Sequence, residues 1–161
     1  MTSLFGILPL VHRQFTADGG IILEEALGYW VTSLYLVSRA ELYRRFKQHG
    51  VDLTPEQWMV LVRLWAAEGV TQSELAQKSL RDLPTMSRIL ATMERSGLIT
   101  RKPDPNDSRA RLVYLSARGR KLRETLVPEA RKMVDAMLSG IPERDIEITR
   151  RTLQRALDNL R

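Results

Sequence analysis

The spacing of apolar side chains predicts long helices towards both ends of the chain. Across residues 22–48 apolar residues recur every three or four positions, which indicates one long amphipathic helix that ends at Gly50. Another long helix follows Ser116 and continues to about residue 139, and a last one follows the break at Gly140. Both terminal regions therefore carry apolar faces that need to be buried.

Three shorter helices lie between these ends. Residues 54–57 (Thr-Pro-Glu-Gln) and 71–74 (Thr-Gln-Ser-Glu) each form a capping box at a helix start. The third helix follows a tight turn at residues 81–84 and takes Pro84 as its first position. Four residues form the buried stripe of this third helix: Met86, Ile89, Leu90 and Met93.

The period then becomes that of strands. Residues 99–103 and 110–115 are short extended runs joined by a turn-rich quartet, Asp-Pro-Asn-Asp, which predicts a two-stranded hairpin. The expected fold is mainly α with a small β-hairpin wing: a winged helix-turn-helix flanked by N- and C-terminal dimerisation helices. We expect three regions: residues 1–50 for the N-terminal arm and long helix, 51–118 for the winged helix-turn-helix lobe, and 119–161 for the C-terminal helices.

The flanking helices are too long and too apolar to be used up on so small a central core. A two-fold dimer would bury their remaining apolar faces, and a monomer that folds its ends against itself is the alternative. We therefore expect a homodimer.

Positive charge is concentrated in the middle of the chain. Residues 78–123 hold twelve Lys and Arg against four Asp and Glu, whereas the rest of the chain is slightly acidic. This distribution is typical of a surface that binds a polyanion, although a solvated basic surface would show it too.

The third short helix turns a suitable mixture of side chains outward. A helical wheel places Pro84, Arg88 and Arg95 opposite the buried stripe, flanked by hydroxyl residues. Hydroxyls and an arginine can reach base edges and phosphates, and Arg88 matches the paired acceptors of guanine. The predicted DNA contacts on this helix are Pro84, Thr85, Ser87, Arg88 and Thr92. If this segment is considered alone, the alternative is an exposed amphipathic helix whose Arg88 is merely solvated.

Basic residues also crowd the hairpin. Arg101, Arg109 and Arg111 are predicted to contact DNA from this wing, since arginines fit a narrow minor groove. Asp107 is expected to orient Arg109 rather than to touch DNA. At the start of the helix after Thr71, Gln72 and Ser73 are further candidates, because helix N-termini bind phosphate.

Six motifs in order between Leu53 and Leu122 resemble those of the MarR (multiple antibiotic resistance regulator) family. They are "LT-x-x-Q" at 53–57, "T-x-x-E-L-A" at 71–76, "T-M-S-R-I-L" at 85–90, "E-R-x-G-L-I" at 94–99, "R-x-x-D-x-x-D-x-R" at 101–109 and "V-x-L-S-x-x-G" at 113–119.

The resemblance implies a homodimer that binds double-stranded DNA at a palindromic operator. By position, Thr85, Ser87 and Arg88 would read the major groove, and Arg109 would be the wing-tip arginine held by Asp107. It also implies a repressor released by a small aromatic or phenolic ligand. A sequence-neutral architectural DNA-binding protein is the alternative function.

Other sites receive less support. Trp30 and Trp65 are candidate contacts for such a ligand, although tryptophans at helical spacing more often fill cores. The chain has no cysteine and only two histidines, so we expect no metal, no cofactor and no thiol sensor. Neither a phosphate-binding loop nor a nucleophile–histidine motif occurs, so we expect no catalytic residues and no enzyme.

The first fifteen residues are apolar enough to suggest a signal peptide. However, no cationic residue precedes their apolar stretch, and Pro9 interrupts it early, which favours a buried N-terminal arm. No apolar run approaches the ~18 residues that a membrane span needs, so we expect no membrane partner. Because the chain has no cysteine and so no disulfide framework, the cytoplasm is the default location.

Overall fold

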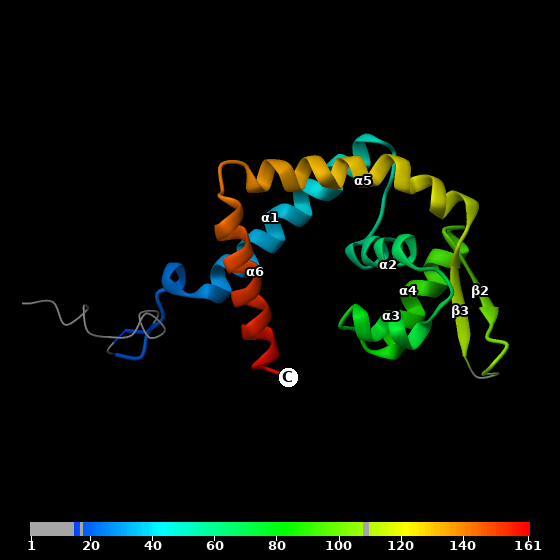
Figure 1. Ribbon diagram of the computed structural model, residues 1–161, viewed down its shortest axis with the longest axis horizontal. Helices are drawn as coiled ribbons and strands as arrows, with labels where there is room; N and C mark the ends of the chain where they lie inside the picture. The colour runs from blue at the N-terminus through cyan, green and yellow to red at the C-terminus, as the bar shows by residue number, and fades with distance from the viewer. Residues whose placement is uncertain (1–14, 17, 108–109) are drawn as a thin grey trace, which may run out of the picture. The chain divides into compact units, whose positions relative to one another are not determined.

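The computed structural model describes residues 15–16, 18–107 and 110–161 (Figure 1). The predicted N-terminal arm therefore lies almost wholly outside the described residues, as does Arg109. A 3₁₀ helix η3 (Leu23–Glu25) precedes the other elements, which are, in order, α1 (Leu27–Gln48), α2 (Pro55–Ala66), β1 (Val70–Thr71), α3 (Gln72–Lys78), α4 (Leu83–Arg95), β2 (Ile99–Pro103), β3 (Arg111–Leu115), α5 (Ala117–Leu138) and α6 (Glu143–Asp158).

Two compact units make up the chain, Met1–Glu41 and Leu42–Arg161, and their boundary falls within α1. In the first unit the predicted helix from residue 22 is interrupted. Ala26 is extended, and the Trp30 indole Nε1 donates to the Glu24 carbonyl oxygen at 2.7 Å. The Glu24 carbonyl oxygen therefore accepts from a side chain instead of from a backbone N–H of a continuing helix. The regular helix begins only at Leu27.

The second unit contains the hydrophobic core. Phe46 from the end of α1 packs beside Trp58 of α2, with ring centroids 4.9 Å apart. The largest fully buried side chains come from α1, α2, α3, α4, both hairpin strands and α5: Phe46, Val60, Leu61, Leu64, Leu75, Met86, Leu90, Met93, Ile99, Val113 and Leu126. One core therefore fixes α4 and the hairpin on the same support.

The sheet has three strands rather than the predicted two. β1 pairs antiparallel with β3 (Val70 opposite Val113), and β3 pairs with β2 (Ile99 opposite Leu115), in the order β1-β3-β2. A two-residue strand is too short to show an alternation of apolar and polar residues. Thr71 also caps α3, so the sequence at this point indicates a helix start. The prediction of a two-stranded hairpin was incomplete for this reason.

Among the three central helices, two start where the sequence predicts. Both capping boxes are present, at Thr54 and at Thr71. The third helix begins one residue earlier than predicted: Asp82 is its N-cap, Leu83 is the first residue, and Pro84 is the second. Residues 81–84 are therefore a cap and a first turn, not a separate tight turn.

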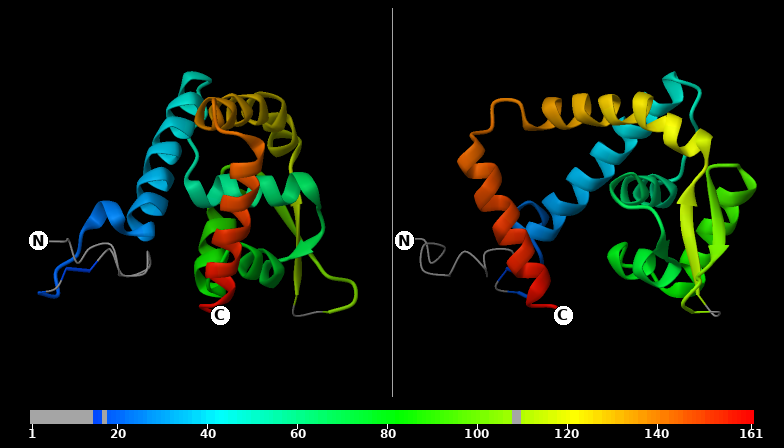
Figure 2. Two further views of the ribbon diagram at one scale, coloured as in Figure 1. Left: turned by 60° about the vertical axis from the view of Figure 1, so that its left-hand side comes forward. Right: turned by 45° about the vertical axis from the view of Figure 1, so that its right-hand side comes forward.

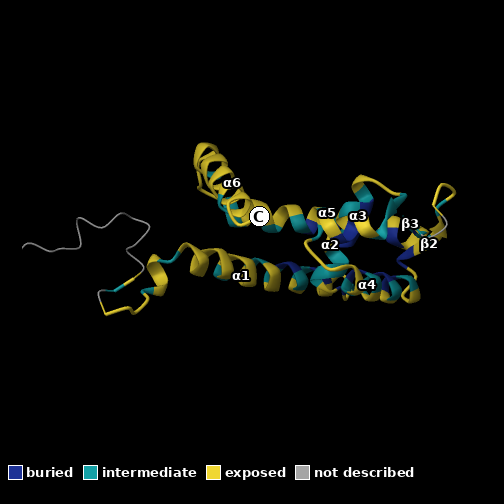
Figure 3. Cartoon of the chain, turned by 90° about the horizontal axis from the view of Figure 1, so that it is seen from below, coloured by how far each residue is buried: buried dark blue, intermediate teal, exposed yellow. Residues whose placement is uncertain are grey.

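The C-terminal helices leave apolar surface uncovered. α5 runs through Pro128 without ending, and α6 has no buried residue. Leu153 and Leu157 of α6 and Leu160 just beyond its end are exposed, and most of the helix is yellow in Figure 3. In the part of the chain that the structure describes, no helix has both the length and the hydropathy required to cross a membrane.

Candidate nucleic-acid interface

The outward face of α4 is the centre of the candidate interface. Met86, Leu90 and Met93 are buried and Ile89 is half-buried, which confirms the predicted inward stripe. On the other side, the sequence-predicted contacts lie together along the helix: Pro84, Arg88 and Thr92 are exposed, and Thr85 and Ser87 are half-buried.

Hydrogen bonds organise the first turns of this face. The Asp82 carboxylate accepts from the Thr85 backbone N–H at 2.7 Å and from the Thr85 hydroxyl at 2.9 Å. Arg88 Nη2 donates to the same hydroxyl oxygen at 3.2 Å. The hydrogen bond from the Thr85 N–H is the main reason that the pKa of Asp82 lies below its ordinary value. An ionised N-cap therefore anchors Thr85, and Thr85 in turn anchors Arg88.

A similar arrangement recurs about two turns later. Arg95 Nη2 donates to the Thr92 hydroxyl at 3.3 Å, and that hydroxyl donates to the Arg88 carbonyl oxygen at 3.1 Å. Each arginine is thus held back along the helix by a threonine three residues earlier. Such contacts limit the conformations from which the arginines approach a ligand.

The wing lies against α4, and Figure 2 shows the hairpin from two directions. Arg101 joins the two elements: its backbone N–H and its guanidinium all donate to the Glu94 carboxylate, at 2.6–3.0 Å. The Arg101 guanidinium is the main cause of a lowered pKa at Glu94. Arg101 therefore fastens the wing to α4, a role that its position in the sequence does not reveal.

Other hairpin cations remain exposed. Arg111 lies opposite Pro103 at the outer end of the strands, and Lys102 Nζ lies 5.2 Å from the centroid of the Tyr114 ring. The turn is closed by backbone hydrogen bonds, from Asp104 N to Ala110 O at 3.1 Å and from Ala110 N to Asp107 O at 3.0 Å. Because Arg109 is outside the described residues, its pairing with Asp107 stays a prediction.

The start of α3 lies beside the wing and α4. Thr71 caps this seven-residue helix by accepting from the Glu74 N–H at 3.2 Å. Ser73 is exposed and Gln72 is half-buried. Both predicted phosphate contacts are therefore on the first turn of α3, but only Ser73 is well exposed.

Comparisons with known proteins agree on one family. A sequence profile of the MarR family matches residues 53–110. The transcriptional regulator HosA of Escherichia coli O111:H- is 33% identical over 95 residues, which cover 55% of this chain and 70% of HosA. The transcriptional activatory protein BadR of Rhodopseudomonas palustris is 31% identical over 113 residues, covering 68% of this chain and 65% of BadR. The chain belongs to the MarR family.

Solved structures support the same assignment. The crystal structure of the S. aureus MepR–DNA complex superposes with a TM-score of 0.76 at 26% identity, over 86% of this chain and 99% of MepR. The relatives and structural neighbours are transcription regulators rather than enzymes. This MarR-family chain is therefore a DNA-binding transcription regulator with a winged helix fold.

In this MarR-family regulator α2 holds the helix-turn-helix in place. Arg63 Nη2 donates to the Lys78 carbonyl oxygen at the end of α3, at 2.7 Å. Arg81, in the turn before α4, lies 3.3 Å from the Glu56 carboxylate. A groove of about 510 Å³ separates the start of α2 from the outward face of α4. Sequence reasoning missed Glu56, Arg63 and Glu94: the first two pair with residues of later elements, and Glu94 pairs with Arg101 only after the chain turns from α4 into β2.

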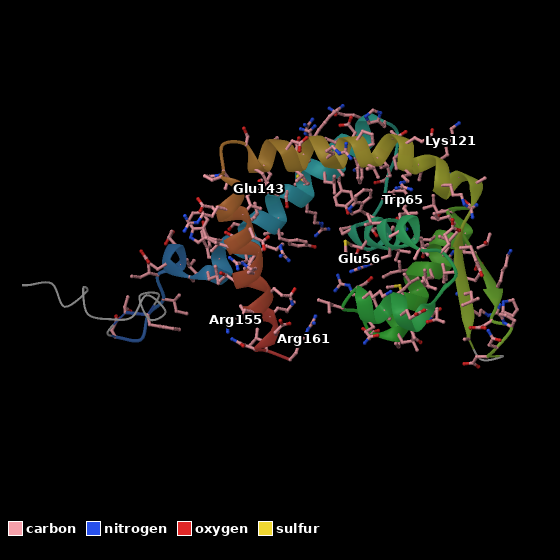
Figure 4. All side chains as sticks on the ribbon, viewed as in Figure 1. Glu56, Trp65, Lys121, Glu143, Arg155 and Arg161 are labelled. Carbon is pink, nitrogen blue, oxygen red and sulfur yellow. The ribbon has the colours of Figure 1, made fainter. Side chains whose placement is uncertain are left out.

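Trp65 lies where a ligand could reach it. Its indole Nε1 donates to the Gly119 carbonyl oxygen at 3.0 Å, so the ring points from α2 towards α5 (Figure 4). It lines a groove of about 430 Å³ with Trp58, three valines and the side chains of Arg123 and Arg131. Trp30 belongs to the other compact unit and is 57% exposed.

Proposed function

We propose that this MarR-family regulator is a homodimeric repressor that acts in the cytoplasm at a palindromic operator and is released by a small aromatic or phenolic ligand. The observation that carries the proposal is the outward face of α4, where hydroxyls and arginines are arranged by an ionised N-cap. A sequence-neutral protein would need only phosphate-binding cations and no such arrangement.

Within each half-site, Thr85, Ser87 and Arg88 read base edges in the major groove. Arg88 is exposed and held by Thr85, so its paired donors can meet the O6 and N7 acceptors of guanine. Pro84 and Thr92 extend the same contact along the helix. Gln72 and Ser73 of α3 bind the flanking phosphates.

The wing enters the adjacent minor groove. Arg109 is its tip, oriented by Asp107, and Arg111 supports it from the outer end of β3. Arg101 contributes positive charge near the backbone while Glu94 keeps it in register with α4. Because the wing and the helix are joined by this pair, both grooves are read as one unit.

A second copy of the chain covers the exposed terminal helices. Leu153 and Leu157 of α6 are 37% and 38% exposed, and Leu27, Leu34 and Val37 of α1 are more exposed still. Burial of such faces in a two-fold interface is favourable. A two-fold dimer that reads successive major grooves would hold its two α4 helices about one DNA turn apart. A palindromic operator follows from that symmetry.

The effector binds the groove between α2 and α5 that Trp65 lines. Two tryptophans and three valines provide apolar walls, and Arg123 and Arg131 provide positive charge. An aromatic ring with an acidic substituent satisfies both features. Trp30 is proposed as a further contact in the dimer.

Selection of bound duplexes from a random library, followed by release assays with aromatic acids, tests this proposal. We expect a palindrome with half-site centres about 34–36 Å apart, and release of the selected duplex by at least one aromatic acid. Replacement of Arg123 by Ala is expected to weaken release and to leave the selected sequence unchanged. Recovery of random sequence would favour the architectural alternative, and a palindrome without release would contradict the effector part alone.

A further inference from the structure

The first turn of α4 presents hydrocarbon where the following turns are polar. Leu83, its first residue, is 48% exposed, and Pro84, the second, is exposed as well. Neither side chain carries a polar atom, and proline has no backbone N–H. An apolar patch therefore occupies the end of the helix that leads into a major groove.

Helix capping does not require a leucine here. The cap is made by Asp82, and the residue before a cap, which often packs against the helix as a hydrophobic staple, is Arg81. Core packing does not require it either, since about half of the Leu83 surface faces solvent. Neither the cap nor the core therefore accounts for a leucine at this position.

Hydrogen bonding from the same turn would disturb the cap. The Thr85 hydroxyl already donates to Asp82 and accepts from Arg88. Its use as a donor to a base would break the bond to the N-cap carboxylate, so Thr85 can read a base only as an acceptor, through its second lone pair. Contact through hydrocarbon leaves this network intact.

The major-groove edge of DNA carries one apolar group, the C5 methyl of thymine. Side chains at a helix start lean towards its N-terminus, and recognition helices direct that end at base edges. We propose that Leu83, with Pro84 beside it, packs on a thymine methyl in each half-site and so selects thymine at that position. The inference rests on the proposed entry of α4 into the major groove.

Replacement of single thymines by deoxyuridine tests this contact, since it removes the methyl and keeps every base-pairing atom. With the selected operator, we expect one thymine per half-site at which the wild-type protein binds roughly fourfold more weakly after substitution, the effect of losing one buried methyl. Leu83→Ala is expected to bind both duplexes equally, and Leu83→Met to retain the preference. Leu80→Ala, which removes a 64% exposed leucine from the residues before the cap, serves as the matched control and should retain it.

Circular dichroism and Tm identify any variant that fails to fold. If no thymine in the half-site is sensitive, or if Leu83→Ala keeps the full preference for thymine over deoxyuridine, the contact does not exist. That result differs from failure of the proposed function, in which selection recovers no operator at all.

Discussion

Arg88 and Arg95 are both exposed arginines on α4, yet they occupy different positions relative to the helix start. Arg88 is tied to Thr85 and so to the N-cap, whereas Arg95 is tied to Thr92 in the last turn. In the proposed complex the helix start leads into the major groove, and the helix end lies closer to the DNA backbone. The two side chains are therefore expected to differ in what they read.

Replacement of Arg88 by Ala is expected to cost about 1–3 kcal/mol at one base pair and to relax specificity there. Arg95→Ala, the matched control, should weaken binding to all sequences alike and reduce the salt slope by roughly 0.9. Fluorescence anisotropy on single-base variants of the operator, at several salt concentrations, measures both effects. If Arg88→Ala weakened binding to every duplex equally, Arg88 would not be a base-reading residue.

The pair of Glu94 and Arg101 gives a prediction for stability. The pKa of Glu94 is lowered in the folded protein, so its contribution is fully present above the ordinary carboxyl value of 4.5 and is lost as pH falls through the folded value. Both side chains are partly exposed, which reduces the effect of Glu94→Gln to about 1 kcal/mol at pH 7. Thermal unfolding of both proteins from pH 7 to pH 3 should show Tm values that converge below pH 4.5. A constant difference across that range would contradict the ion pair.

Sequence reasoning reached the outward residues of α4 but not the partners of the wing. The period of the buried stripe fixes which side of a helix faces outward, so Arg88 and Thr85 could be named. Arg101 was predicted only as a DNA contact, because nothing local shows that Glu94 returns beside it after the chain turns. The Asp82 cap did have a signal, an acidic residue three positions before a threonine.

At the scale of elements, the junction between the wing and α5 depends on one close approach. Gly119 is buried in the first turn of α5, and a Cβ added there would lie 2.1 Å from the Leu98 carbonyl oxygen. This oxygen also accepts from the Ser116 backbone N–H at 3.0 Å, so it is held in place. The glycine at the end of the motif at 113–119 thus has a packing reason.

Gly119→Ala is expected to destabilise the fold by about 1–3 kcal/mol, since either the start of α5 or the Leu98 carbonyl must shift. Gly28→Ala in α1 is the matched control, because no atom lies within 4 Å of its added Cβ. The control should be neutral or should stabilise the protein by about 0.5–1 kcal/mol through lower chain entropy. Urea unfolding of both variants measures the difference. Equal stability of the two would show that the junction is not tightly packed.

The element boundaries show where a periodic pattern is informative. Long apolar stripes and capping boxes predicted most helices within a few residues. A stripe repeats with the period of the helix, and a capping box marks its first turn. The two-residue strand β1 repeats nothing, and the break before α1 depends on a Trp30 hydrogen bond to Glu24. Single tertiary contacts of this kind leave no period in a sequence.

At the scale of the whole molecule, the apolar surface that one chain leaves exposed is the reason to expect a dimer. The apolar residues of α6 are partly or largely exposed although the helix is strongly amphipathic in sequence. No local signal in the sequence states what covers this face. Family membership gives the winged helix and DNA binding, and the assembly remains a proposal.

Leu153→Glu is expected to convert the dimer to monomer, because it buries a carboxylate in an apolar interface. Gln154→Glu adds the same charge at the next, exposed position of α6; it replaces the hydrogen bond from Gln154 to Asp158, an effect local to the helix surface, and should leave the dimer intact. Sedimentation equilibrium of both variants, together with circular dichroism for folding, decides between them. If both variants remain dimeric, the dimer interface does not lie on this face of α6.

The central claim is that the outward face of α4 makes this chain a sequence-specific regulator. Competition binding between the selected operator and a scrambled duplex of the same composition, at physiological salt, tests it most directly. We predict an affinity at least about 10³-fold higher for the operator, and a marked loss of that ratio in Arg88→Ala. Equal affinities of the wild-type protein for both duplexes would contradict the account.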